Sequence, residues 1–225
     1  MLPRILEPEV MDTYEDARDY DEMDHRAVNQ LFVSDLLAFA KDTAALAGDL
    51  LDLGTGTAQI PIEFCRQCPT GRIMAVDAAI EMLEIARYNL ELASQTSRVQ
   101  LAHIDAKRLP YPAGMFAVVM SNSIVHHIPE PAGALAEAVR VLAPGGVIFF
   151  RDLLRPASND ELEQLVATYA AGCNEHQRAL FAASLHAALT LEELQALVVP
   201  LGFAAETVQQ TSDRHWTWAA RLTSA

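Results

Sequence analysis

The sequence of 225 residues is short of cysteine and has no long apolar run. Its three cysteines form an odd number and do not make a disulfide framework for a chain of this size. No apolar stretch approaches the roughly 20 residues that a membrane-spanning helix needs. The N-terminal residues also lack the long apolar region and small-residue cleavage site of a secretion signal. These absences predict a cytoplasmic protein without a membrane partner.

Basic residues are scarce as well. The chain has 16 Lys and Arg against 30 Asp and Glu, a formal net charge of −14. No basic run interrupts this acidic character, so nucleic acid is not an expected partner. The acids are concentrated in residues 1–30, which we interpret as an acidic arm at 1–27 followed by a folded domain. Hydrophobic residues make up 51% of the chain, which is enough to bury a core.

Beyond the arm, the spacing of apolar residues alternates between helix and strand. Apolar positions three and four residues apart predict a helix over 28–46. Short apolar runs then predict strands, with helices in the short connections between them. The strands are expected at 49–53, 72–76, 98–104, 116–120 and 147–150. This alternation indicates right-handed parallel crossovers with helices on both faces of the sheet.

The alternation stops after Phe150. Residues 151–189 are predicted to be mainly helical, and two strand-like segments at 203–208 and 216–222 are close enough only for an antiparallel hairpin. The expected fold class is α/β, a Rossmann-like three-layer sandwich. Its sheet has seven mostly parallel strands and ends in a C-terminal antiparallel hairpin strand. We divide the chain into the arm 1–27 and a domain 28–225 with a helical insertion at 151–189.

The motif Asp52-Leu53-Gly54-Thr55-Gly56 stands where the first strand meets the first helix of this pattern. Glycines there let the backbone turn sharply and approach a ligand closely. The third glycine of a dinucleotide fingerprint would stand at Gln59 and is missing. A carboxylate at Asp52 would repel a pyrophosphate but suits an ammonium group.

Two further acids follow the next strands. Asp77 closes the second strand, where an acid can accept both hydroxyls of a ribose. Asp105 follows the third strand and is placed to meet an adenine amino group. An ammonium group, a ribose and an adenine together describe S-adenosylmethionine.

These motifs resemble the class I S-adenosylmethionine-dependent methyltransferase family. The resemblance covers about residues 28–150 and resumes at the terminal hairpin. It rests on residues 50–57, Ala75-Val76-Asp77, Asp105-Ala106 and the sequence Leu-Ala-Pro-Gly-Gly at 142–146. It implies S-adenosylmethionine as cofactor. The implied contacts are Asp52, Gly54 and Gly56 at the methionine end, Asp77 at the ribose, Asp105 and Ala106 at the adenine, and Ser121 beside the cofactor.

Methyl transfer from a sulfonium chiefly requires alignment of the acceptor and exclusion of water. A general base matters only if the acceptor must lose a proton, and the reaction itself requires no metal, so none is expected. His126 and His127 follow the fourth strand and are the candidate catalytic residues. The alternative is that this pair stabilises the loop beneath the cofactor. The chain lacks the Asn-Pro-Pro-Tyr motif of enzymes that methylate base or amide nitrogens.

Charged residues directly after the fifth strand need partners or a ligand. Arg151, Asp152 and Arg155 are therefore candidates for substrate binding, with a structural ion pair as the alternative. Tyr14 or Tyr20 is expected to face the sulfonium when the arm and the 151–189 insertion close over the acceptor pocket. Cys65 and Cys68 are interpreted as packing residues, because a zinc site would need two more suitably spaced ligands.

The expected function is S-adenosylmethionine-dependent methyl transfer to a small-molecule acceptor by in-line displacement. Two alternatives remain. One is a catalytically inactive S-adenosylmethionine-binding or scaffold protein. The other is an NAD-dependent oxidoreductase, against which Gln59 and Asp52 both argue. The acceptor atom and the oligomeric state are left open.

Overall fold

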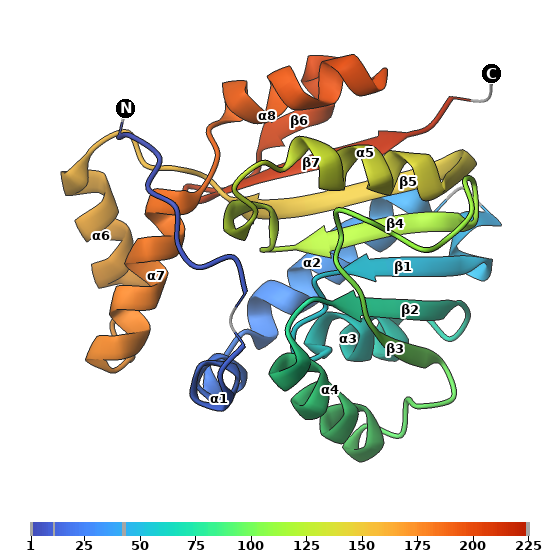
Figure 1. Cartoon of the computed structure of the whole chain (residues 1–225), viewed down its shortest axis with the longest axis horizontal. Coiled ribbons are helices and arrows are strands. Elements are labelled where there is room, and N and C mark those ends of the chain that lie inside the picture. The colour runs from blue at the N-terminus through green and yellow to red at the C-terminus, as the bar shows by residue number, and fades with distance from the viewer. Residues whose placement is uncertain (1, 11, 42–43, 224–225) are drawn as a thin grey trace.

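A computed structural model describes residues 2–10, 12–41 and 44–223, and its centre is one seven-stranded sheet (Figure 1). The strands lie in the order β3-β2-β1-β4-β5-β7-β6. β1 to β5 are parallel, and β7 is antiparallel to both β5 and β6. The predicted fold is confirmed. The strand bounds are β1 Asp49–Leu53, β2 Arg72–Asp77, β3 Val99–His103, β4 Phe116–Asn122, β5 Leu142–Leu153, β6 Val208–Gln210 and β7 His215–Arg221.

Helices cover both faces of the sheet, and each covered face forms a separate apolar cluster. On one face, side chains of β1, β4 and β5 pack against α2 (Arg26–Ala40), α3 (Gln59–Gln67) and α4 (Ile80–Leu92). On the other face, they pack against α5 (Ala132–Val141) and α8 (Leu191–Val198). Because both faces are buried, the strands carry apolar residues without alternation, as is typical of parallel sheets.

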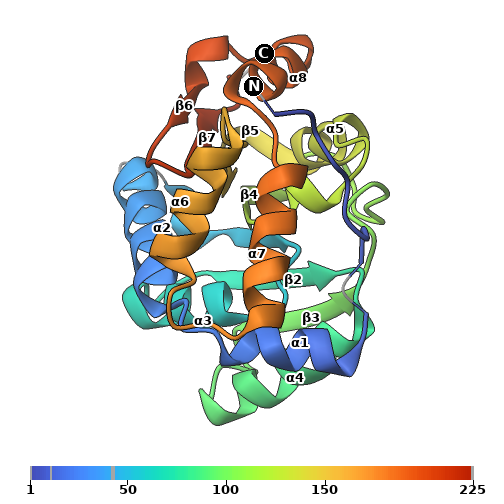
Figure 2. The same ribbon diagram turned by 90° about the vertical axis from the view of Figure 1, so that its left-hand side faces the viewer.

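The carboxyl edge of the sheet is covered by a third group of helices. The arrowheads of β1, β2 and β4 point toward α1 (Tyr14–Glu22), α6 (Asn159–Tyr169) and α7 (Glu175–Ala187) (Figure 1). The end-on view shows these three helices in front of the sheet (Figure 2). β5 continues to Leu153, three residues beyond the expected strand, because it pairs with β7 as far as His215. The helical segment between β5 and α8 therefore begins later than predicted.

The N-terminal arm is bound along this edge by specific contacts. The Arg4 guanidinium donates to the backbone carbonyls of His126, Ile128, Pro129 and Ala187 at 2.7–3.1 Å. Further along, Asp12 accepts hydrogen bonds from the first backbone N–H groups of α4. Helix α1 then packs Ala17 against Ala79 and Met82.

Within the described residues, no helix is long and apolar enough to cross a membrane.

Candidate active site

The glycine loop between β1 and α3 is a tight turn whose shape requires glycine. Gly54 and Gly56 have positive φ angles of 68° and 54°, a region that favours glycine. A Cβ built on Gly54 would lie 1.9 Å from the Ile124 side chain, whereas a Cβ on Gly56 would lie 3.6 Å from Tyr20. The N–H groups of Gly54 and Thr55 donate to the Val76 carbonyl, which ties the loop to the end of β2.

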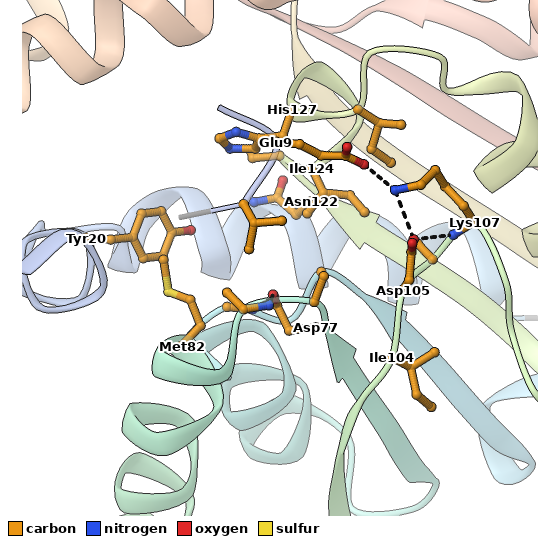
Figure 3. Close-up of a pocket in the computed structure, with 18 residues that line it drawn as sticks. Glu9, Tyr20, Asp77, Met82, Ile104, Asp105, Lys107, Asn122, Ile124 and His127 are labelled. Carbon is orange, nitrogen blue, oxygen red and sulfur yellow. Dashed lines mark hydrogen bonds and ion pairs between the residues drawn. The ribbon is translucent and has the colours of Figure 1, made fainter. Parts of the chain in front are cut away.

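A cleft passes over this loop and across the ends of β2 and β3; we call it the glycine-loop cleft (Figure 3). Tyr20 lies at one end of the close-up, and Asp105 with Lys107 lies at the other. The cleft is also lined by Gly54, Gly56, Asp77, Ala106, Asn122 and His127. Predicted site residues from three strand ends and from the arm therefore meet in one cavity.

Asp77 is engaged with the loop it faces. Its carboxylate accepts the Gly56 N–H and the Ala79 N–H, both at 2.8 Å. Burial raises the pKa of Asp77, although these backbone donors partly oppose the rise. Asp105 is more exposed and lies 3.1 Å from the Lys107 ammonium group, which also pairs with Glu9 of the arm.

A small recess, which we call the inner recess, adjoins the cleft through Tyr20, Gly54 and Asn122 and reaches Asp52. Among the described residues, Thr57 Oγ1 and Asn122 Oδ1 are buried without a hydrogen-bond partner, and the Thr55 hydroxyl is a side-chain partner of the buried Asp52 carboxyl. Burial raises the pKa of Asp52 to about 7 and that of Tyr20 to about 12. Unpaired buried acceptors are costly, and an ammonium group supplies the donors they lack. The recess thus fits the amino acid end of S-adenosylmethionine.

A second cavity, the outer pocket, lies between the arm helix and the helices α6 and α7. It shares Tyr20, Asn122, Ser123 and His127 with the glycine-loop cleft. Its other walls are mostly apolar, with His126, His25 and His215 among the polar residues. The apolar lining includes Met23, Val28, Leu153, Leu180 and Phe181. Burial lowers the pKa of His215 to about 4, so this histidine is uncharged at neutral pH, whereas Asp24 and Arg214 add one charge of each sign to the pocket lining.

His126 is buried at the boundary of the two cavities and is held by Asp152. Asp152 Oδ1 lies 2.5 Å from His126 Nδ1, while Oδ2 accepts the N–H groups of Val125 and His126. Burial alone would lower the pKa of His126, but the charges of Asp152 and Glu7 outweigh it and raise that pKa. Glu7 comes from the arm, and its Oε1 lies 3.5 Å from His126 Nε2.

Several predicted residues lie outside both cavities. Ser121 is turned into the sheet, where its hydroxyl donates to the Leu53 carbonyl. The two arginines form ion pairs in place of the expected substrate contacts, Arg151 with Asp35 and Arg155 with Glu193. Asp152 supports His126 and lines neither cavity.

Tyr14 and Tyr20 of the arm, both expected as candidates to face the sulfonium, differ in their position. Tyr14 is 62% exposed, which leaves Tyr20 as the tyrosine at the cleft.

Comparisons with known proteins agree with this architecture. Residues 51–150 match the family model described as a methyltransferase domain. This match, together with the methyltransferase relatives and the cleft described above, indicates the class of enzyme. Residues 51–150 therefore form a methyltransferase domain of the class I S-adenosylmethionine-dependent type. S-adenosylmethionine is accordingly the cofactor.

Two curated relatives of this chain are named as methyltransferases. The 27-O-demethylrifamycin SV methyltransferase of Amycolatopsis mediterranei is 31% identical over 77% of this chain and 62% of its own length. The malonyl-[acyl-carrier protein] O-methyltransferase of Geobacter sulfurreducens is 29% identical over 83% of this chain and 66% of its own length. The chain thus spans less than two thirds of either relative.

A solved structure extends the likeness of fold to nearly the whole chain. The S-adenosylmethionine-dependent methyltransferase of Aquifex aeolicus superimposes with a TM-score of 0.69 at 14% identity. The match covers 94% of this chain and 99% of that protein.

Sequence reasoning missed several residues of the two cavities. Asn122 and Ser123 follow Ser121 directly and replace it at the cleft, because the strand turns its side chains alternately and Ser123 has a φ of 62°. Met82 reaches the cleft from α4. Glu9 reaches the cleft from the arm, and Glu7 of the arm lies against His126 and His127. Nothing in a run of acids distinguishes a buried carboxylate from a solvated one.

Proposed function

We propose that this methyltransferase chain transfers a methyl group from S-adenosylmethionine in the glycine-loop cleft to an uncharged small molecule in the outer pocket. The observation that carries this proposal is the wall shared by the two cavities. Tyr20, Asn122, Ser123 and His127 line both of them. A transfer between two bound molecules needs such a shared wall, because the reacting atoms must approach within about 3–3.5 Å.

The cofactor supplies a methyl group on a positively charged sulfur. Asp52 is placed to pair with the ammonium group and Asp77 with the ribose, while Asp105 and Ala106 lie at the adenine end. The Tyr20 ring borders both cavities and can face the sulfonium, an arrangement worth about 0.5–2 kcal/mol. The positions of these side chains in the cleft and recess support these assignments.

The lining of the outer pocket supports the proposed class of acceptor. Its apolar residues favour a largely apolar molecule, and α6 and α7 exclude water from it. His126 is the residue positioned to accept a proton from an acceptor hydroxyl, because Asp152 orients its ring through Nδ1. The net charge of −14 disfavours nucleic acid and so supports a small molecule as the substrate.

Titration calorimetry tests the cofactor half of the proposal. S-adenosylmethionine and its demethylated product should bind, and NAD should not. Binding of NAD alone would overturn the assignment in favour of an oxidoreductase.

The acceptor half requires a transfer assay. Labelled methyl groups should pass from S-adenosylmethionine to members of a panel of uncharged, apolar hydroxyl compounds. Phe181→Arg in the outer pocket should abolish transfer and leave cofactor affinity unchanged, whereas Asp77→Ala should weaken cofactor binding. Tight cofactor binding without transfer to any acceptor class would support the inactive binding protein instead.

A further inference from the structure

Three side chains with metal-binding groups converge where the arm crosses the carboxyl edge of the sheet. Glu7, His126 and His127 each offer one ligand atom, and these atoms lie within 4.8 Å of one another. Glu7 belongs to the arm, whereas the two histidines belong to η2 (Val125–His127), the short helix after β4. The cluster therefore joins two segments that are more than a hundred residues apart.

The separations within the cluster suit a bound metal ion. Glu7 Oε1 lies 3.1 Å from His127 Nδ1 and 3.5 Å from His126 Nε2. Two ligands about 2.0–2.2 Å from a tetrahedral ion are roughly 3.2–3.6 Å apart. Glu7 and His127 are also joined by a side-chain hydrogen bond. A bound ion would take the place of that proton between the two ligand atoms.

The surroundings hold the ligands in place. Asp152 accepts from His126 Nδ1, which leaves Nε2 as the nitrogen that faces Glu7. A carboxylate behind a histidine in this way is the usual second partner of metal-binding imidazoles. The Ser184 hydroxyl lies 3.3 Å from both carboxylate oxygens of Glu7. Only 9% of the Glu7 side chain and 4% of the His126 side chain are exposed.

We propose that Glu7, His126 and His127 form a binding site for a divalent transition-metal ion such as Zn²⁺. Two imidazoles and one carboxylate are a ligand set for zinc and related ions rather than for Mg²⁺ or Ca²⁺. His126 and His127 also line the outer pocket, so a fourth coordination position faces the acceptor side. The ion would fasten the arm to η2. It would also occupy His126 Nε2, so the proton acceptance proposed above for His126 belongs to the metal-free protein.

Calorimetric titration of the chelator-treated full chain with ZnCl₂ tests the site without any assay of methyl transfer. Wild-type protein should bind one Zn²⁺, and Glu7→Gln and His127→Gln should each lower the affinity by about 100-fold. Glu9→Gln is the matched control, since it neutralises an acid two residues away that pairs with Lys107, and it should bind like wild type. Co²⁺ should give the visible absorption of tetrahedral coordination in wild type but not in Glu7→Gln.

Two outcomes would overturn the proposal. One is the absence of Zn²⁺ binding by wild-type protein, which would leave the cluster as an ion-pair contact between arm and domain. The other is binding that survives Glu7→Gln and is lost in Cys65→Ser, which would place the ion at the buried Cys65 and Cys68. Far-ultraviolet circular dichroism of each variant checks that it is folded. Since cofactor binding is measured separately, failure of this site leaves the proposed methyl transfer intact.

Discussion

The buried Asp52 carboxyl is expected to make the stability of this protein depend on pH. The side chain is 1% exposed in β1, and a hydrogen bond from the Thr55 side chain only partly offsets the effect of that burial. Removal from water penalises the charged form, which is why the pKa rises to about 7. In the unfolded chain, the same carboxyl ionises near its ordinary value of about 4.

This pKa shift predicts that stability falls as pH rises from about 4 to 7. In that range the folded protein keeps the Asp52 proton and the unfolded chain has lost it, so the free energy of unfolding decreases with pH. Asp52→Asn should remove this slope and stabilise the protein at pH 8 by an amount on the order of 4 kcal/mol. Urea denaturation at a series of pH values measures the effect. Parallel pH profiles for wild type and variant would show that Asp52 is ionised throughout.

Asp77 is expected to matter for both the loop and the cofactor. Asp77→Ala removes a charged acceptor of the ribose hydroxyls, which costs about 1.5–3 kcal/mol, or about 10- to 150-fold in affinity for S-adenosylmethionine. It also frees the N–H groups of Gly56 and Ala79, so the melting temperature should fall. The sequence alone gives no reason for the second effect. Calorimetry and thermal melts measure the two, and unchanged cofactor affinity in the folded variant would refute the ribose assignment.

At the level of elements, replacing a glycine by alanine is expected to have opposite effects on stability in the glycine loop and in α5. Gly54→Ala would combine a positive φ angle with a Cβ 1.9 Å from Ile124, and it should destabilise the fold by about 2–5 kcal/mol. Gly133 lies exposed in α5 with no atom near its missing Cβ, so Gly133→Ala should stabilise by about 0.5–1 kcal/mol. Chemical denaturation compares the pair. A stable Gly54→Ala protein would mean that the loop can adopt another conformation.

The elements also show where local patterns predict structure and where they do not. The strands from β1 to β4 are found close to their expected positions, because short apolar runs between turn residues are a local signal. β5 is longer than expected, since pairing with β7 extends it through the charged residues Arg151 and Asp152. Arg151 bonds to Thr217 across the sheet and to Asp35 of α2, and Asp152 bonds to His126, contacts that a local pattern cannot indicate.

For the whole molecule, the arm is predicted to act as a cover that the cofactor stabilises. Arg4 joins three segments through four backbone carbonyls, and Glu9 and Val10 line the cleft. Hydrogen exchange in α1 and α7 should slow when the demethylated cofactor product is added, with the strand cores unchanged. In Arg4→Ala, exchange in α1 should be fast without ligand. Arg18→Ala is the control, because its guanidinium pairs with Asp19 and Glu22 of the same helix.

Equal exchange in the free and bound states would mean that the arm is a fixed part of the fold and not a cover. Fast exchange in both Arg4→Ala and Arg18→Ala would show that α1 depends on its own ion pairs rather than on the arm contacts.

The sequence by itself determined the order of strands and helices, the glycine loop and the acids at the strand ends. These features depend on neighbours in the chain, and parallel strands bring their carboxyl ends to one edge of the sheet. Only the tertiary structure decided which polar residues face the cavities. Arg151 and Arg155 are drawn into distant ion pairs, Ser121 bonds across to β1, and Glu7 reaches the two histidines from the arm. Such pairings join residues far apart in the chain, because a buried charge takes whichever partner the packed elements bring near.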